Sequence, residues 1–421
     1  MKRVVFSTVG SLGDLHPYIA IAKVLAARGH TAVIATTDRY KRIVEAEGIG
    51  YAPLRPPEAV FGGLQAVAAK LFDPLRGPPY LVREMIMPYV REQYEDTLAA
   101  CEGASMLVTH PLTMAGPLVC AKTGLPWVSS VLAPASLMSA IDPPLLNGAW
   151  WGRSLRRMRP ASYALLLKIV GAIARGWERP LHDLRSDLGL PRAQHAALLQ
   201  GQFSPLLNLA LFPRLIAEPQ ADWPANTLLS GFARFDGPPV DARSQADLAA
   251  FLAAGDAPIV FALGSSVVMI AGDFWDKAIA ASLSLGRRAI LLTGTPLARP
   301  LPAGVKAFDY LPYSAVFAHA AAIVHQAGIG TLAQALAAGR PQFIVPVAFD
   351  QPDNARRAVG LGLARSLPIA KVTPAILARE LAALLADPAY ARCARDSMHG
   401  LDGGAARAAD ALLDLQVARL S

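Results

Sequence analysis

Short apolar runs alternate with longer helical runs along this chain, and glycines mark the turns between them. The first fifty residues show the pattern once: a strand run at 3–8, a glycine-punctuated turn at 9–17, an amphipathic run at 18–28 and a second strand run at 31–36. Apolar runs of this length, bounded by turn residues, are typical of strands buried on both faces. The chain therefore begins as the βαβ unit of a doubly wound parallel sheet in an α/β fold.

The same alternation predicts further strands in both halves of the chain. They are expected at 105–109, 127–132, 258–263, 289–292, 305–308, 320–324 and 343–346. Residues 212–239 break the pattern, because they are rich in Pro, Gly and Asp and indicate loops around one short strand. We place a domain boundary in this stretch, which gives an N-terminal domain at 1–225 and a C-terminal domain at 226–403.

Length and composition agree with two domains and narrow the class of protein. The 421 residues exceed one typical domain, and 53% apolar against 17% charged residues permits large cores. No run of 18 uncharged apolar residues predicts a membrane span, and the apolar run after Met1 is too short for a signal peptide. Three scattered cysteines predict neither a disulfide framework nor a metal site and favour a reducing cytoplasm. The net charge of +8 favours an anionic ligand or surface.

One stretch of the C-terminal half has the local chemistry of an anion site. The strand at 320–324 is followed by a turn that contains Gly328 and Gly330, and then by an Ala/Leu-rich helical run. The first-turn N–H groups of a helix have no intrahelical partner and carry positive partial charge. The stretch is therefore a phosphate cradle or, in the alternative interpretation, an ordinary βα turn that uses glycine for close packing.

The spacing of several motifs resembles a known family. Tyr310-x-Pro312, His325-x-x-Gly328-x-Gly330-Thr331, Gly339-x-Pro341 and Asp350-Gln351 together resemble the donor-binding signature of nucleotide-sugar glycosyltransferases with the GT-B fold. These inverting, UDP-glycosyltransferase-like enzymes include plant natural-product, sterol and antibiotic glycosyltransferases. The amino-acid sequence of residues 212–239 resembles that of the bacterial rhamnosyltransferase B subunits of rhamnolipid synthesis and of bacterial flavonoid rhamnosyltransferases.

The resemblance carries expectations about architecture and cofactors. It implies two Rossmann-like domains that face each other across a cleft, with a C-terminal helix at 404–421 that crosses back to the N-terminal domain. It implies a nucleotide-sugar co-substrate, no further cofactor and no metal ion in the reaction.

The resemblance also implies a catalytic base near the N-terminus. The stretch Gly13-Asp14-Leu15-His16-Pro17 matches the bacterial form of the loop in which an aspartate deprotonates the acceptor hydroxyl. His110 stands where plant relatives place the Asp that orients the base, so Asp14 and His110 look like that dyad with its partners exchanged. His16 is a second candidate. The alternatives are a turn or helix-capping role for Asp14 and a strand-capping role for His110.

Donor contacts are implied along the C-terminal half. The candidates are Gly264, Ser265, Ser266, Thr293, Gly294, Tyr310, Leu311, His325, Gln326, Gly328, Gly330, Thr331, Gln334, Asp350 and Gln351. Two of them depart from the family pattern, which usually has His in place of Gln326 and Glu in place of Gln334. Because that Glu binds the ribose hydroxyls of uridine-type donors, its replacement favours a deoxyribose and hence a dTDP-sugar.

The region from 134 to 182 is expected to build much of the acceptor pocket. The acceptor-binding candidates are Gly13, Met138, Trp150 and Trp151. Eight Lys and Arg residues lie among aliphatic and aromatic ones between Arg153 and Arg185, a pattern that suits an interfacial helix at an anionic membrane. The alternative is a solvated basic face on ordinary core helices. No motif supports nucleic-acid binding.

These observations predict an inverting, metal-independent glycosyltransferase. It would move a sugar, in first place rhamnose from dTDP-rhamnose, to a hydroxyl of an apolar acceptor such as a hydroxy-fatty-acid lipid or a flavonoid. Three alternatives are a UDP-glucose-type donor with the same chemistry, a nucleotide-sugar epimerase and a non-catalytic GT-B activator partner.

Overall fold

The computed structural model describes residues 1–61, 64–73, 76–145, 150–297 and 299–420. The chain divides into two compact units. Unit 1 consists of Met1–Pro144, Ala149–Phe235 and Asp402–Ser421, and unit 2 consists of Leu145–Gly148 and Asp236–Leu401. Each unit is built on its own parallel sheet, so that the predicted α/β fold with two Rossmann-like sheets is confirmed.

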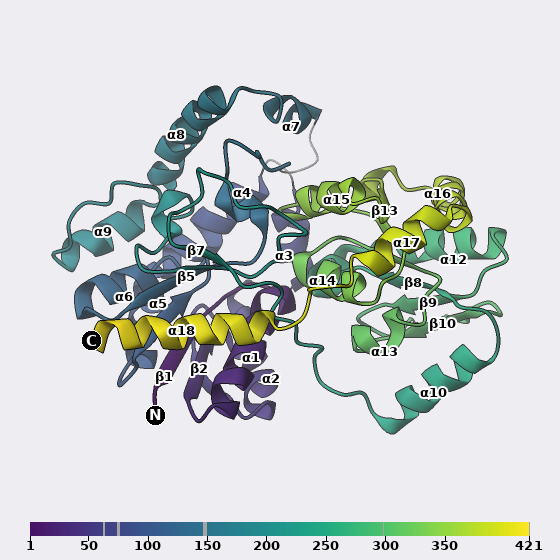
Figure 1. The fold of residues 1–421 in the computed structure, drawn as a ribbon, viewed down its shortest axis with the longest axis horizontal. Coiled ribbons are helices and arrows are strands. Elements are labelled where there is room, and N and C mark those ends of the chain that lie inside the picture. Colours follow the sequence, from purple (N-terminus) through teal and green to yellow (C-terminus); the bar gives the residue numbers. More distant parts are fainter. Residues whose placement is uncertain (62–63, 74–75, 146–149, 298, 421) are drawn as a thin grey trace. The chain divides into compact units, whose positions relative to one another are not determined.

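The described part of unit 1 contains a seven-stranded sheet in the order β3-β2-β1-β4-β5-β6-β7 (Figure 1). Its strands are β1 (Arg3–Ser7), β2 (Thr31–Thr36), β3 (Gly50–Pro53), β4 (Met106–Thr109), β5 (Trp127–Val131), β6 (Asn208–Ala210) and β7 (Thr227–Leu229). From β1 the chain first builds outward through β2 and β3, and then returns to build β4 to β7 on the other side. The strand order therefore reverses between β1 and β4, the point at which open α/β sheets bind ligands.

Helices connect the strands of unit 1. They are α1 (Leu12–Ala27), α2 (Lys41–Ala46), α3 (Leu64–Leu71), α4 (Gly77–Tyr80), α5 (Val90–Ala100), α6 (Gly116–Thr123), α7 (Trp150–Leu155), α8 (Pro160–Trp177), α9 (Arg179–Asp187) and α18 (Gly404–Leu420). Shorter 3-10 or π segments lie at Asp38–Tyr40, Glu58–Phe61, Leu81–Ile86, Met87–Tyr89, Pro134–Leu137 and Gln200–Gln202. The C-terminal α18 packs along α1 (Figure 1). Arg28, the C-cap residue of α1, pairs with Asp410 of α18. No helix of the described residues is long and apolar enough to cross a membrane.

The first helix differs from the sequence prediction, which placed residues 9–17 in a turn. Helix α1 begins at Leu12, and Pro17 lies inside it. Ser11 and Asp14 form a capping box: the Ser11 hydroxyl accepts from the Gly13 N–H, and the Asp14 carboxylate accepts from the Ser11 N–H. Such a box satisfies orphan N–H groups and starts a helix. The helix therefore begins before Pro17, which removes one backbone donor inside it.

Unit 2 repeats the design with a six-stranded sheet in the order β10-β9-β8-β11-β12-β13, as far as the described residues show. Its strands are β8 (Ile259–Ala262), β9 (Ala289–Leu292), β10 (Val305–Phe308), β11 (Ala322–His325), β12 (Gln342–Ile344) and β13 (Ala364–Ser366). Its helices are α10 (Ala242–Ala253), α11 (Gly264–Val267), α12 (Phe274–Ser284), α13 (Tyr313–Phe317), α14 (Ile329–Ala337), α15 (Gln351–Gly360), α16 (Pro374–Ala386) and α17 (Pro388–Asp396), with 3-10 turns at Val268–Ile270 and Ile369–Lys371. Here the strand order reverses between β8 and β11.

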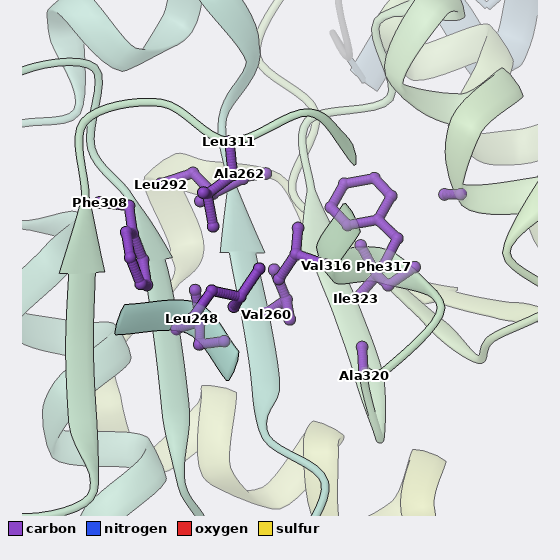
Figure 2. Close-up of a cluster of buried hydrophobic side chains, with 12 residues drawn as sticks. Leu248, Val260, Ala262, Leu292, Phe308, Leu311, Val316, Phe317, Ala320 and Ile323 are labelled. Atoms are coloured by element: carbon purple, nitrogen blue, oxygen red, sulfur yellow. The ribbon is translucent and has the colours of Figure 1, made fainter. Parts of the chain in front are cut away.

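The core of unit 2 shows why the strand runs are apolar throughout. Val260 and Ala262 of β8 point to one face of the sheet, where they join Phe308 of β10 and Phe317 of α13 (Figure 2). The alternate residue Phe261 is also fully buried, and its ring meets that of Phe274 on α12. Helices thus cover both faces of this sheet, and all positions of the four inner strands β9, β8, β11 and β12 are buried.

Candidate active site

Asp14 and His110 meet at the strand-order reversal of unit 1. Asp14 lies in the first turn of α1, which follows β1, and His110 directly follows β4. Since β1 and β4 pair in parallel, with Ser7 opposite Thr109, their carboxyl ends deliver both side chains to one edge of the sheet. Asp14 Oδ1 lies 3.2 Å from His110 Nε2. The structure brings the two sequence candidates together.

The hydrogen bonds around His110 determine which member of the pair can accept a proton. The Leu112 backbone N–H donates to His110 Nδ1 at 3.2 Å, so this nitrogen carries a lone pair. In the neutral ring the hydrogen then sits on Nε2 and is donated to Asp14 Oδ1. The imidazole has no remaining lone pair, whereas the carboxylate keeps acceptor sites. Within the pair, Asp14 is the proton acceptor.

The second carboxylate oxygen of Asp14 caps its own helix. Asp14 Oδ2 accepts from the Ser11 N–H at 2.7 Å and from the Ser11 hydroxyl at 2.9 Å. The turn in front of it needs glycine, since Gly10 has a φ of 134° and a Cβ there would lie 2.4 Å from Asp14 Oδ2. One carboxylate oxygen of Asp14, Oδ2, therefore caps the helix, and the other, Oδ1, pairs with His110.

The surroundings keep the Asp14 carboxylate ionised. Burial alone would raise its pKa, but the hydrogen bond and charge of His110 and the bonds from Ser11 outweigh burial and hold the pKa below the ordinary value. The Asp14 side chain is 30% exposed and the His110 side chain 6% exposed. The carboxylate is thus the part of the pair that a bound molecule can reach.

His16 lies two residues further along α1 and has different surroundings. Its ring stands edge-on to the ring of Phe235, with centroids 5.0 Å apart. His16 Nε2 is buried and has no hydrogen-bond partner among the described residues. Burial lowers its pKa to about 4, so the ring is neutral at physiological pH.

The donor candidates of unit 2 follow the carboxyl ends of its strands. At the reversal between β8 and β11, Gly264 and Gln326 approach each other so closely that a Cβ on Gly264 would lie 2.1 Å from Gln326 Nε2. Gly264 has a φ of 68°, and a Cβ on Gly328 would lie 2.9 Å from the same nitrogen. The two glycines therefore make room for the Gln326 amide at the centre of this edge.

The Gln326 amide is polar, buried and weakly bonded. Its Nε2 donates to Thr331 Oγ1 at 3.4 Å, and its Oε1 lacks a hydrogen-bond partner within the described part of the chain. Thr331 belongs to the first turn of α14, whose N-cap is Gly328. The amide, the Thr331 hydroxyl and the first-turn N–H groups lie together at this edge, as an anion cradle requires, and their binding of an anion stays a prediction.

His325 is fully buried, and both of its ring nitrogens are engaged inside unit 2. Its Nδ1 accepts from the Ala327 N–H at 3.1 Å, and its Nε2 lies 2.9 Å from Gln342 Oε1. Burial lowers its pKa to about 4. Ala327 has a φ of 65°, so the His325 bond holds a strained residue in the turn. A direct bond from His325 to a diphosphate would require one of these contacts to break; that role stays a prediction.

Asp350 and Gln351 lie at the start of α15, beyond the end of β12. Gln351 Oε1 accepts from the Val347 N–H at 2.9 Å and so holds the preceding loop. Asn354 donates to Asp350 Oδ2 at 2.7 Å and to the Ala327 carbonyl at 2.9 Å. Through Asn354 the β12 loop is tied to the turn before α14.

The other donor candidates surround this centre. Ser265 and Ser266 are half-buried in α11, and Thr293 donates to the Thr295 carbonyl at 2.7 Å. Tyr310 is 39% exposed and donates to the Pro238 carbonyl at 3.1 Å, whereas the Leu311 side chain lies in the core (Figure 2). Gly294 is exposed with a φ of 74°, Gly330 is half-buried in the first turn of α14, and Gln334 is half-buried further along that helix.

The acceptor candidates lie in unit 1. Gly13 is the second residue of α1, and its N–H donates to Ser11 Oγ at 3.2 Å. Met138 has a φ of 49° and packs against a small cluster that includes Ala174 of α8. Trp150 and Trp151 begin α7, and their side chains fall outside the described part of the structure.

Sequence reasoning missed four residues that shape these sites: Gly10, Ser11, Gln342 and Asn354. The Ser-x-x-Asp spacing of Ser11 and Asp14 is a capping-box signal that could have identified Ser11. Gln342 is a polar residue in a buried strand, which by itself indicates a buried partner. Gly10 makes room for the Asp14 side chain, and Asn354 reaches the Ala327 carbonyl from another βα unit; the sequence gives no signal for either contact. Among the described residues no group of His, Cys, Asp or Glu could hold a metal ion.

Comparisons with known proteins identify the family. Residues 4–103 match the model of the glycosyltransferase family 28 N-terminal domain, and residues 289–400 match the model of the erythromycin biosynthesis protein CIII-like C-terminal domain. The chain is 30% identical over 407 residues to the O-mycaminosyltylonolide 6-deoxyallosyltransferase of Streptomyces fradiae, covering 93% of this chain and 92% of that relative.

Solved structures with the same fold agree. The calicheamicin glycosyltransferase CalG4 superposes with a TM-score of 0.72 at 21% identity, covering 100% of this chain and 99% of the other. The spinosyn rhamnosyltransferase SpnG complexed with thymidine diphosphate superposes with a TM-score of 0.65 at 18% identity, covering 96% and 98%. With the paired Asp14 and His110 in one unit and the cradle of Gln326 and Thr331 in the other, these matches show that the chain belongs to the UDP-glycosyltransferase-like GT-B family and is a glycosyltransferase.

Proposed function

We propose that this glycosyltransferase moves a 6-deoxyhexose, in first place rhamnose, from a dTDP-linked donor to a hydroxyl of an apolar small-molecule acceptor, with inversion at the anomeric carbon. The observation that carries the proposal is the pair at the unit 1 reversal, where an ionised, partly exposed carboxylate lies 3.2 Å from a ring nitrogen of a buried imidazole. A general base for an acceptor hydroxyl needs this combination of accessibility and ionisation.

Asp14 would remove the acceptor proton as the new C–O bond forms. An aspartate with a depressed pKa is a weak base toward a free alcohol, whose own pKa is far higher. The hydroxyl becomes acidic while its oxygen attacks the oxocarbenium-like anomeric carbon, so proton transfer and sugar transfer run together. His110 would orient the carboxylate through its Nε2–H.

The cradle of unit 2 would stabilise the departing diphosphate. The first turn of α14 presents N–H groups and the positive end of the helix dipole, and the Thr331 hydroxyl and Gln326 amide add polar contacts there. Ser265 in the turn after β8 is a further candidate. Asp350 and Gln351 would hold the sugar hydroxyls, and Tyr310 would stack on the base.

The donor proposal rests on Gln334 and on the relatives. A neutral amide at this position accepts hydrogen bonds from the two ribose hydroxyls more weakly than a carboxylate would. The site should therefore favour ribose over deoxyribose less strongly. The Streptomyces fradiae relative is named for transfer of another 6-deoxyhexose, and the spinosyn rhamnosyltransferase was solved with thymidine diphosphate. The first name supports a 6-deoxyhexose here, and the second supports a dTDP-linked donor.

The acceptor proposal rests on the apolar stretch from 134 to 145 and on Met138, which is half-buried. A hydroxylated aglycone of lipid, flavonoid or macrolactone type has the apolar surface that such a lining favours. The Streptomyces fradiae relative, which is named for transfer to O-mycaminosyltylonolide, supports a small-molecule acceptor.

A donor and acceptor screen tests the proposal. The purified chain is assayed with dTDP-rhamnose, UDP-rhamnose, dTDP-glucose and UDP-glucose against a hydroxy-fatty acid, a flavonol and a hydroxylated macrolactone. We expect the highest kcat/KM with dTDP-rhamnose and an inverted anomeric centre in the product by NMR. An equal or higher kcat/KM with UDP-rhamnose contradicts the nucleotide, and a faster glucose donor contradicts the sugar.

Two variants examine the role of Gln334. Gln334→Glu should raise kcat/KM for the UDP-sugar relative to the dTDP-sugar, because the carboxylate can accept from both ribose hydroxyls. Gln245→Glu, on the exposed side of α10, is the matched control and should leave that ratio unchanged. A ratio that moves equally in both variants removes Gln334 from the nucleotide site.

A further inference from the structure

Helix α8 exposes an apolar stripe. Leu165, Ile169 and Ile173 are 60%, 52% and 55% exposed, and their spacing of four residues places them on one side of the helix. The opposite side holds the buried residues Tyr163 and Ala174. A surface helix normally turns its apolar stripe toward the core and its polar stripe outward. In α8 the outward side is apolar, so this helix has a second apolar face with no core against it.

The charge of this region has one sign. Between Asp142 and Glu178 the sequence contains no acidic residue and six basic ones, at 153, 156, 157, 159, 168 and 175. Lys168 and Arg175 are exposed on α8 itself. An apolar stripe flanked by basic residues is the pattern of helices that lie in the plane of an anionic membrane surface.

A basic pocket adjoins the carboxyl end of the stripe. Its volume is about 590 Å³, and α8 contributes Ala172, Arg175 and Gly176 to its wall. Arg185 and Arg192 also line it, so three guanidinium groups share one pocket. His182, Asp183 and Ser186 complete its polar lining, and Asp183 already pairs with Arg179.

Two of the three arginines of this pocket are held in place by hydrogen bonds to their own chain. Arg175 donates to the Gln194 carbonyl at 3.5 Å, and Arg185 donates to the Pro191 carbonyl. A guanidinium carries five N–H donors in a planar fork, so one such bond leaves donors directed elsewhere. Three such groups match the oxygens of a phosphate monoester or diester.

We propose that the outer face of α8 and the adjoining basic pocket, which we call the α8 surface, dock unit 1 onto a bilayer that contains anionic phospholipid. Leu165, Ile169 and Ile173 would enter the boundary between headgroups and acyl chains, and the arginine pocket would take a phosphate headgroup. Charge complementarity selects this occupant: Arg156 is paired with Asp142, but residues 143–177 themselves include six basic residues and no acidic one, and this charge would repel a second copy of the same face. The inference is independent of the donor and the acceptor, since it concerns a surface and not the transfer reaction.

Vesicle flotation with the full-length protein tests the proposal. Phosphatidylcholine vesicles are compared with vesicles that also contain about one-third phosphatidylglycerol, at low salt and in about 0.5 M salt, where charges are screened within a few ångströms. We expect at least tenfold tighter binding to the anionic vesicles at low salt and loss of that preference at high salt. Equal binding to both vesicle types, or no binding to either, overturns the proposal.

Paired variants separate the two halves of the α8 surface. Leu165→Gln with Ile169→Gln should weaken binding at least tenfold, and Arg185→Gln with Arg192→Gln should abolish the preference for anionic lipid. The controls are Leu283→Gln on α12, an equally exposed leucine at 49%, and Arg287→Gln with Arg392→Gln, two exposed arginines of unit 2. Thermal melts confirm that each variant folds. Controls that weaken binding as strongly as the α8 variants overturn the assignment.

Two further experiments test whether the α8 surface instead binds a free phosphate ester or a second copy of the chain. If soluble glycerol 3-phosphate at millimolar concentration releases the protein completely from the vesicles, the pocket is a site for free phosphate esters and the docking proposal is wrong. If the α8 variants change the elution volume in gel filtration but leave vesicle binding unchanged, the face is an interface between copies of the chain. Continued binding in the presence of glycerol 3-phosphate and an unchanged elution volume support the proposal.

Discussion

Asp14 divides its carboxylate between two tasks: one oxygen caps α1 through Ser11, and the other faces His110. Asp14→Asn should keep the cap, because an amide oxygen can still accept from the Ser11 N–H. It should lower kcat at least about 100-fold with an aliphatic alcohol, the lower end for loss of a general base. The measurement is steady-state transfer, with nucleotide affinity by calorimetry as the check that the donor site is intact.

Two controls separate catalysis from capping. Ser11→Ala removes the hydroxyl of the cap, and we expect a loss of about 1 kcal/mol of folding free energy with most of the turnover retained. His110→Ala should cost less in kcat than Asp14→Asn, and the loss should shrink with acidic phenolic acceptors. Normal turnover of aliphatic alcohols by Asp14→Asn would place the base elsewhere, and His16 would be tested next.

His325 has two candidate roles, contact with the diphosphate and support of the turn at Ala327, and two variants can separate them. If it contacts the diphosphate, both His325→Ala and His325→Asn should lower kcat more than tenfold, which is about 1.4 kcal/mol or more in the barrier. If it only holds the Ala327 turn, His325→Asn should retain most of the turnover, since the amide oxygen can accept from the Ala327 N–H as Nδ1 does. Steady-state kinetics of the two variants decide between the roles.

The same residue predicts a pH dependence of stability. The folded-state pKa of His325 is lowered to about 4, so its contribution is fully present above about pH 6.5 and is lost as pH falls toward 4, where the unfolded chain binds the proton first. The difference is on the order of 3 kcal/mol at the lower limit. His325→Asn should flatten this part of the curve in denaturant titrations, and an unchanged slope would contradict the buried, neutral ring.

At the scale of elements, each sheet uses its strand-order reversal to bring two loops together. Gly264→Ala should disturb the donor loop, because the new Cβ would lie 2.1 Å from Gln326 Nε2 in addition to the strain of a φ of 68°. Gly286→Ala is the matched control, since its φ is 61° and nothing lies within 4 Å of the added Cβ. Gly286→Ala should cost about 1–2 kcal/mol of stability from strain alone.

The effect of the two glycine substitutions on the donor site is measured as the affinity for dTDP. Gly264→Ala should weaken the affinity for dTDP at least tenfold by calorimetry, and Gly286→Ala should leave it unchanged. Equal affinities in the two variants would show that the contact between Gly264 and Gln326 is not part of the donor site.

At the scale of the whole molecule, the C-terminal helix α18 packs against α1 and belongs to unit 1, although the chain between them passes through unit 2. Ala408, Ala409 and Leu412 of α18 are fully buried, and Arg407 donates to the Ser230 carbonyl at 2.5 Å. A chain that ends at Leu401 should lose more than about 3 kcal/mol of unit 1 stability, since burying one leucine contributes about 1.5–3 kcal/mol and α1 loses its cover. Calorimetric unfolding should show one transition shifted downward.

Unit 2 provides the internal reference for that truncation. Its affinity for dTDP should stay within twofold of the full chain, because the cradle residues belong to unit 2. Arg28→Gln removes only the exposed ion pair with Asp410 and should cost at most about 1 kcal/mol. If the truncated chain melts like the full chain, α18 does not stabilise unit 1.

The sequence by itself determined the α/β class, the parallel-sheet runs and the glycosyltransferase family. Those features depend on local periodicity and on fixed spacing within single βα units, such as the stretch from His325 to Thr331. Pairs such as Asp14 and His110 were accessible only through the family resemblance, because strand order, and not sequence distance, brings the two loops together. Local sequence patterns predict where strands lie along the chain but not the order in which the strands pair in the sheet.

Only the tertiary structure decided the finer assignments. It placed Leu311 in the core, began α1 at Leu12, fixed the hydrogen on His110 Nε2 and engaged both nitrogens of His325. It also left the apolar stripe of α8 without a core, although its period is that of a buried helix. Burial and hydrogen bonding depend on which neighbours arrive from distant parts of the chain, so they follow from packing and not from pattern.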